Sequence, residues 1–325
     1  MTSGSNLEKI LEAGEFAVTA ELGPPMSASA AEVKEKMDVL RGSADAFNIT
    51  DCQTAVVRLS SIAAAIMLEQ DGMEPVMQMT TRDRNRIAIQ ADILGAAAFG
   101  IKNCLCIAGD HQSSSAAGRL QGHPGAKNVY DVDSIQLLDM LRGMRDHAEM
   151  EGGDPIEEPP QLFIGAAWTP MADPVEFRVI RLAKKVAAGA QFIQTQGVYD
   201  VEQFKGVMKK VRDMGLHEKT AILPGIIVPK SSGMLRYMNK AVPGVSVPKE
   251  LIDRFPKRKK DASPEEKKEI REKTNEVALE ITVELIEQCR EIEGVKGVHI
   301  QAIEAEEMIP DIVERADLFP RPQVS

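Results

Sequence analysis

The chain has 325 residues and a formal net charge of -10 at pH 7. This length is sufficient for a large barrel domain, which takes roughly 250 residues plus insertions. The acidic balance argues against nucleic acid or an anionic membrane as the main partner. No apolar stretch reaches the roughly 18 residues that a membrane-spanning helix needs, and the first residues lack the pattern of a signal peptide. We therefore expect a soluble, cytoplasmic protein.

Short β-rich runs alternate with amphipathic stretches along the chain. The predicted strands are residues 16–22, 46–50, 75–80, 104–108, 162–168, 192–198, 221–227 and 298–303. The predicted helices are residues 31–40, 59–70, 84–99, 133–148, 174–188, 201–214, 232–240 and 264 to about 290. This alternation implies parallel strands with right-handed crossovers. The sequence predicts an α/β fold, a single (β/α)8 TIM barrel over residues 1–325, with a doubly wound open sheet as the alternative.

Several helix ends carry their own signals. Gly100, Gly189 and Gly215 each precede a predicted strand, where glycine accepts the left-handed geometry of a helix C-terminus. The last predicted helix has Ser263 as its N-cap and Glu266 as the partner residue of a capping box. These signals place the helix boundaries independently of the apolar pattern.

In a (β/α)8 barrel the functional groups lie where the strands end and the following loops begin. In the first predicted strand the apolar residues alternate with Ala17, Thr19 and Glu21, so Glu21 should point into the barrel mouth. An inward carboxylate is costly unless it has a partner or a chemical role. A structural ion pair is the alternative explanation for Glu21.

Other strand ends carry groups that suit a planar, hydrogen-bonding ligand. Glycine at position 109 allows a ligand to approach the backbone closely, Trp168 offers a ring for stacking, and a proline-flanked loop presents Lys230 as a substrate-binding candidate. No metal site is expected, because no H-x-E or H-E-x-x-H motif lies at the barrel mouth and the four cysteines form no C-x-x-C pair. Trp168 could equally be a packed lid residue.

These residues resemble the methylenetetrahydrofolate reductase family over nearly the whole chain. The carriers are TAELGPP at 19–25, the Gly109-Asp110 pair, KKVAAGAQFIQTQGVYD at 184–200, LPGIIVP at 223–229 and VPKELIDRF at 247–255. Their order and spacing are more specific than any one motif. The resemblance implies a (β/α)8 barrel with a flavin, usually FAD, at the carboxyl ends of the strands.

The resemblance also implies roles for individual residues. Glu21 matches the family's general acid, which helps protonate N10 of 5,10-methylenetetrahydrofolate so that reduced flavin N5 can deliver hydride to the methylene carbon. Asp110 matches an acid near both flavin and pterin, and Gln196 a glutamine that binds the substrate. The positions that match flavin contacts are Thr50, Gly109, Asp110, Trp168 and, for a flavin phosphate, Lys185.

Three positions depart from the family pattern. Ala108 replaces a cofactor-contacting arginine, Gln78 replaces a histidine, and Ser232 stands where NADH-using members have a stacking phenylalanine. The first departure leaves FMN open beside FAD. The last indicates that an iron–sulfur or other electron-delivering partner protein supplies electrons, as in the similar reductases of anaerobic one-carbon pathways. A homo-oligomer also remains open.

Two other functions remain as alternatives at this point. A folate- or corrinoid-linked methyltransferase barrel would bind the same pterin without a flavin. A non-catalytic subunit would keep the barrel for assembly only, which the presence of Glu21, Asp110 and Gln196 disfavours.

Overall fold

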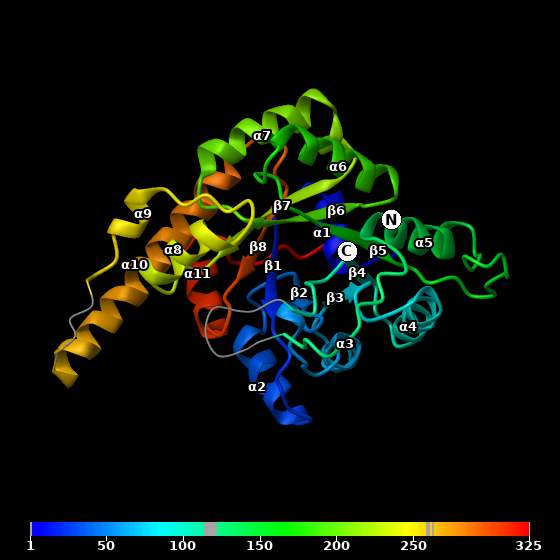
Figure 1. Cartoon of the computed structure of the whole chain (residues 1–325), viewed down its shortest axis with the longest axis horizontal. Helices are drawn as coiled ribbons and strands as arrows, with labels where there is room; N and C mark the ends of the chain where they lie inside the picture. Colours follow the sequence, from blue (N-terminus) through cyan, green and yellow to red (C-terminus); the bar gives the residue numbers. More distant parts are fainter. Residues whose placement is uncertain (1, 114–121, 258–260, 262, 325) are drawn as a thin grey trace.

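The computed structural model describes residues 2–113, 122–257, 261 and 263–324. Its centre is a closed barrel of parallel strands that pair in sequence order, with β8 pairing back to β1 (Figure 1). This confirms the predicted (β/α)8 barrel and contradicts the open-sheet alternative. The strands are β1 (Ala17–Leu22), β2 (Ala46–Ile49), β3 (Pro75–Thr80), β4 (Asn103–Ile107), β5 (Phe163–Trp168), β6 (Phe192–Gly197), β7 (Ala221–Ile227) and β8 (Gly297–Gln301).

Helices follow the strands and surround the barrel (Figure 1). They are α2 (Ala30–Leu40), α3 (Ser61–Gln70), α4 (Arg86–Ala98), α5 (Ser134–Asp146), α6 (Val175–Ala187), α7 (Val201–Asp213), α8 (Ser232–Ala241) and α10 (Pro264–Arg290). Their ends lie within two residues of the predicted ones, which is the usual uncertainty of helix boundaries. None of the helices in the described ranges is long and apolar enough to cross a membrane.

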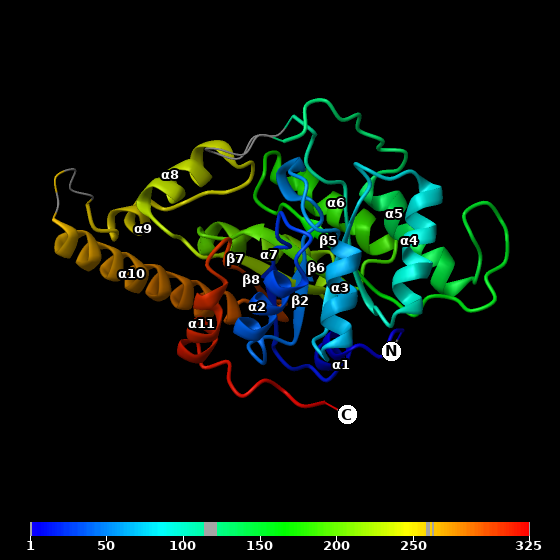
Figure 2. The same ribbon diagram turned by 90° about the horizontal axis from the view of Figure 1, so that it is seen from below.

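Short elements that the sequence pattern did not predict complete the fold. They are α1 (Asn6–Glu12), α9 (Lys249–Asp253), α11 (Ile309–Arg315) and the 3-10 turns η1 (Gln53–Ala55), η2 (Leu216–Glu218) and η3 (Glu306–Met308). The amino end of the barrel is closed by α1, whose Leu7 and Ile10 are fully buried against the first inward residues of the strands. Figure 2 shows α1 and both termini at this end of the barrel, with α8 at the opposite end.

The predicted helix-end signals are confirmed. The Ser263 hydroxyl accepts a hydrogen bond from the Glu266 backbone N–H, and the Glu266 carboxylate accepts one from the Ser263 N–H, which is a complete capping box. Gly100, Gly189 and Gly215 have φ values of 89°, 114° and 64°, in the left-handed region that favours glycine.

The alternation of side chains along β1 determines which of them point into the barrel. Val18, Ala20 and Leu22 are fully buried between the barrel and its helices. Thr19 points the other way, because its hydroxyl bonds to His299 and Gln194 inside the barrel. Glu21 therefore lies one step further toward the carboxyl end of the barrel on the same inner side.

Candidate active site

A cavity of about 640 Å³ lies at the carboxyl ends of the strands. This volume is in the range typical of small-molecule sites. Every strand except β2 contributes to its lining, as does the loop after β2, and the lining includes apolar side chains such as Leu105, Ile107 and Ile227 together with acids, amides and hydroxyls. The lining therefore suits a ligand with both flat apolar faces and hydrogen-bonding edges.

Glu21 lies in the wall of this cavity with a perturbed acidity. Burial is the main cause, and with the negative charge of Glu306 it raises the pKa of Glu21 to about 7, while Lys36 and Arg58 oppose the shift. A carboxyl group with this pKa is protonated in a large fraction of molecules at neutral pH. Glu21 can therefore donate a proton to a ligand in the cavity.

A buried polar layer forms the floor beneath the cavity. The Asn48 and Gln194 amides exchange hydrogen bonds of 2.6 and 2.9 Å, and Gln194 also donates to the Thr19 hydroxyl at 3.0 Å. Thr19 contacts Nδ1 of His299 at 3.0 Å. Burial lowers the pKa of His299 to about 3, so its ring is neutral at physiological pH. This network fixes the inner side chains of four strands. The acid of the site, Glu21, lies in the next layer toward the carboxyl ends of the strands.

Gly109 and Asp110 lie at the end of β4, in a tightly packed corner of the cavity. Gly109 has a φ of 86°, and a Cβ there would lie 3.1 Å from Thr80 and 3.2 Å from Arg82, so only glycine fits without strain. The Asp110 carboxylate accepts a hydrogen bond of 2.7 Å from the Thr54 backbone N–H. The acid is thus held at the junction of the loops that follow β2 and β4.

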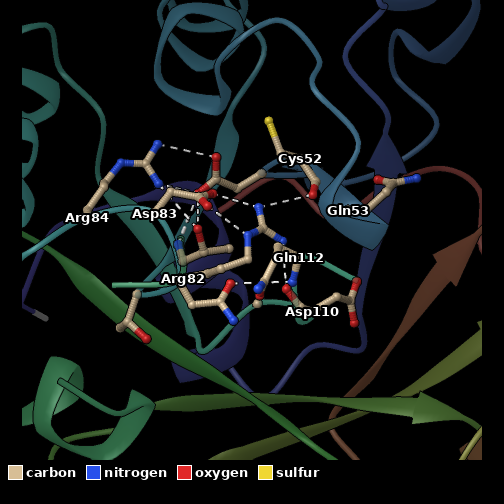
Figure 3. A network of polar contacts seen from close by, with 12 residues as sticks. Cys52, Gln53, Arg82, Asp83, Arg84, Asp110 and Gln112 are labelled. Atoms are coloured by element: carbon tan, nitrogen blue, oxygen red, sulfur yellow. Dashed lines mark hydrogen bonds and ion pairs between the residues drawn. The ribbon is translucent and has the colours of Figure 1, made fainter. Parts of the chain in front are cut away.

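Arg82 connects these two loops, and the sequence analysis had not singled it out. Its guanidinium lies between Cys52 and Asp110 and donates to both backbone carbonyls, at 3.2 and 3.1 Å (Figure 3). Asp83 pairs with the same guanidinium at 2.6 Å. Arg82 therefore supplies the cation nearest to the Gly109-Asp110 corner among the cavity-lining residues, where the family pattern would place an arginine at position 108.

The loop after β2 is strained where it meets Asp110. Cys52, Thr54 and Ala55 have φ values of 48°, 56° and 58°, although none of them is glycine. Each such residue costs roughly 1–2 kcal/mol. Strain of this kind persists where surrounding contacts over-determine the backbone, and it is concentrated at functional sites. The Arg82 and Asp110 hydrogen bonds supply those contacts.

Most of the predicted site residues meet at this cavity. Glu21, Thr50, Gly109, Asp110, Trp168 and Gln196 all line it. The Trp168 indole N–H donates to the Arg178 carbonyl at 2.9 Å, which holds the ring against α6, and only 3% of the residue is exposed. The Thr50 hydroxyl is buried and has no hydrogen-bond partner among the described residues. The predicted contacts of Trp168 and Thr50 with a flavin remain predictions.

Two predicted residues lie outside the cavity lining. Lys185 is buried behind β5 and donates to the Ala167 carbonyl, and its burial lowers its pKa to about 8. Lys230 spans the rim, where its ammonium donates to the carbonyls of Ile303 and Glu304 at 2.6 and 3.4 Å. Neither residue lines the cavity, although their carbonyl partners Ala167 and Ile303 do. Their predicted roles in binding remain predictions.

The residues present fit a flavin better than a metal ion. The cavity offers a close backbone approach at Gly109, an apolar wall at Ile107 and Ile227, and amides and hydroxyls from several strands, all of which suit a planar heterocycle. In the described part of the chain, no three histidine, cysteine or acidic side chains are grouped so that they could hold a metal ion.

The fold and this cavity define a (β/α)8 barrel with a protonatable acid and a flat-ligand site at the carboxyl ends of its strands. A model of the family described as methylenetetrahydrofolate reductase matches residues 6–317, and the chain belongs to that family.

Two curated relatives carry the same family name. The chain is 24% identical over 270 residues to a Caenorhabditis elegans protein named probable methylenetetrahydrofolate reductase (NADPH). The alignment covers 81% of this chain and 35% of the relative. It is 26% identical over 255 residues to methylenetetrahydrofolate reductase 1 of Schizosaccharomyces pombe, covering 76% of this chain and 36% of the relative. The chain thus matches about a third of the length of these relatives.

A solved structure shares the fold at low sequence identity. It is an uncharacterized protein from Clostridium thermocellum, described as binding two copies of 5-methyl-5,6,7,8-tetrahydrofolic acid. The two structures align with a TM-score of 0.58 and 15% identity, over 96% of this chain and 98% of the other. At this identity the likeness supports the barrel fold alone.

Proposed function

We propose that this chain reduces 5,10-methylenetetrahydrofolate to 5-methyltetrahydrofolate, with a bound flavin as the hydride donor. The observation that carries the proposal is Glu21, an acid with a pKa of about 7 in the wall of a 640 Å³ cavity, in a chain that belongs to the methylenetetrahydrofolate reductase family. Opening the five-membered ring of the substrate requires a proton on N10, and a carboxyl group with this pKa can supply one at neutral pH.

The chemistry that a reduced flavin supplies when bound is a hydride for the methylene carbon of the substrate. The chain's own residues prepare that step. Glu21 would give its proton to N10 and so allow the five-membered ring to open, and a reduced flavin, when bound, would supply the hydride that completes the methyl group. Gln196, which lines the same cavity from β6, offers an amide for the pterin edge. FAD is the expected flavin, and FMN remains open because position 108 is alanine.

Asp110 and Thr50 support this arrangement. Asp110 places a negative charge at the corner where β4 ends, and it can orient the folate and tune the potential of the flavin. Thr50 has a hydroxyl without a partner in the same lining. The apolar wall around Ile107 and Ile227 excludes water from the flat faces of both ligands.

A half-reaction experiment tests the proposal. The purified chain is reconstituted with FAD or with FMN and desalted, and the visible flavin absorbance shows which one is retained. The retained flavin is then reduced and mixed with 5,10-methylenetetrahydrofolate in a stopped-flow instrument. We expect reoxidation with formation of 5-methyltetrahydrofolate, and a rate about 10²–10⁴-fold lower in Glu21→Gln, because the amide cannot protonate N10.

Two results would contradict the proposal. A chain that retains neither flavin would favour the methyltransferase alternative, which binds folate without one. A Glu21→Gln rate within about threefold of wild type, far short of the contribution typical of a positioned acid, would remove Glu21 from the mechanism. Glu176→Gln, a change in an exposed glutamate of α6, serves as the control for a neutral substitution of a carboxylate.

A further inference from the structure

Glu21 lies between two cavities. It lines the large cavity and also an adjoining cavity of about 40 Å³. The charged groups that line the small cavity are Lys36, Arg58, Glu304 and Glu306. A space of this size can hold water. These four charged groups do not line the large cavity, so they share with Glu21 only the lining of the small one.

An ion pair holds two of these groups together. The Lys36 ammonium on α2 lies 2.5 Å from the Glu306 carboxylate on η3, and only 31% and 13% of their side chains are exposed. The Arg58 guanidinium donates to the Pro24 carbonyl at 3.3 Å and keeps its charge, because this carbonyl is neutral. The charges that act on Glu21 are thus one anion, Glu306, and two cations, Lys36 and Arg58.

We propose that Glu306 is a positioning residue that keeps Glu21 protonated by neutralising Lys36 from the side of the small cavity. This role rests on the proposed function of Glu21 as the acid. The physical reason is that an unpaired cation beside a carboxyl group stabilises its ionised form, whereas an anion destabilises it. Because the pair lies outside the large cavity, its effect persists when flavin and folate fill the site.

The two members of the pair should act in opposite directions. Glu306→Gln removes the anion and leaves Lys36 unneutralised, so the pKa of Glu21 should fall. Lys36→Met removes the cation and leaves Glu306, so the pKa of Glu21 should rise. Each shift should be large enough to measure, on the order of one pKa unit, because both charged groups line the same small cavity as Glu21. If the ion pair served only to hold α2 against η3, both substitutions would break it equally. The two variants would then not shift the pKa of Glu21 in opposite directions.

Infrared titration of the ligand-free chain measures these shifts directly. The carboxyl signal of Glu21 is isolated by subtracting the spectrum of Glu21→Gln, with each variant paired with its own Glu21→Gln double variant. This readout needs neither flavin nor folate, so it remains decisive even if the chain proves not to reduce folate. Lys36→Gln, which also removes the cation, serves as the second variant if Lys36→Met does not fold, and Lys36→Arg, which keeps the cation, should stay close to wild type.

The matched control is the exposed Lys210–Glu176 pair, whose atoms lie 2.7 Å apart between α7 and α6. Glu176→Gln should leave the titration of Glu21 unchanged. Opposite shifts in Glu306→Gln and Lys36→Met, with none in the control, support the proposal. Shifts in the same direction, or no shift in Glu306→Gln, overturn it.

Discussion

Glu21 combines two properties that oppose each other, because the burial that makes it a proton donor also makes it expensive to fold. Its pKa rises from 4.5 to about 7 in the folded chain, mainly through burial. The unfolded chain releases this proton between those values, whereas the folded chain retains it. The contribution of the Glu21 carboxyl group to the free energy of unfolding is therefore fully present below pH 4.5 and is lost as the pH rises through 7. An acid tuned for proton transfer thus lowers stability at neutral and alkaline pH.

The raised pKa of Glu21 predicts how the stability of the Glu21→Gln variant, compared with wild type, changes with pH. The amide does not titrate, so the free energy of unfolding of the variant relative to wild type should increase between pH 4 and pH 8, by ~3 kcal/mol at most. Urea unfolding of both proteins at pH 4, 6 and 8 measures the difference. A difference that stays constant over this range would mean that Glu21 titrates normally in the folded chain.

The sequence predicted the direction of Glu21 but not the position of every charged head group. Alternation along β1 was enough for Glu21, because a short side chain points where its Cα–Cβ bond directs it. Lys185, Lys230 and Arg82 have long flexible side chains, and local contacts decide where their charges lie. His299 was not predicted as a site residue, although it lies on the same face of β8 as Gly297 and Gln301. No motif beside this strand indicated a functional group there.

Among the secondary-structure elements, the strands and the long helices could be predicted from the sequence, whereas the short helices could not. Each predicted strand and long helix exists, because periodic burial over many residues leaves a pattern. The missed helices α1, α9 and α11 have seven, five and seven residues, which is too short to show a helical period. The strained loop at 52–55 was missed for another reason. Its conformation is imposed by Arg82 and Asp110, which are distant in sequence.

This loop gives a prediction about Thr54, which has a φ of 56°. Thr54→Gly should stabilise the ligand-free chain by up to about 1.5 kcal/mol, because it releases about 1–2 kcal/mol of strain and adds about 0.5–1 kcal/mol of backbone entropy cost. Chemical unfolding of the two proteins tests this. Thr274→Gly, within helix α10, is the matched control and should destabilise by a few tenths of a kcal/mol, roughly the difference between the helix propensities of threonine and glycine. A less stable Thr54→Gly would show that the loop contacts depend on the threonine side chain.

At the scale of the whole molecule, the open question is how electrons enter. The cavity opens at the carboxyl ends of the strands, and the chain matches only about a third of the length of its curated relatives. Ser232, at the start of α8, stands where NADH-using family members have a stacking phenylalanine. The sequence also lacks the G-x-G-x-x-G dinucleotide fingerprint. A nicotinamide would therefore lose an aromatic contact worth roughly 0.5–1.5 kcal/mol beyond its burial.

We therefore predict that NADH and NADPH are poor direct donors and that an electron-delivering partner protein, such as an iron–sulfur protein, reduces the flavin. Steady-state assays of the reconstituted chain should show activity with reduced dyes or an added iron–sulfur protein and little with either nucleotide. Turnover with NADH or NADPH in the common range of about 1–10³ s⁻¹ would defeat the prediction. Tyr237, which lines the cavity, would then be the candidate stacking ring, and Tyr237→Ala should abolish nucleotide-driven turnover while sparing the reaction with reduced dyes.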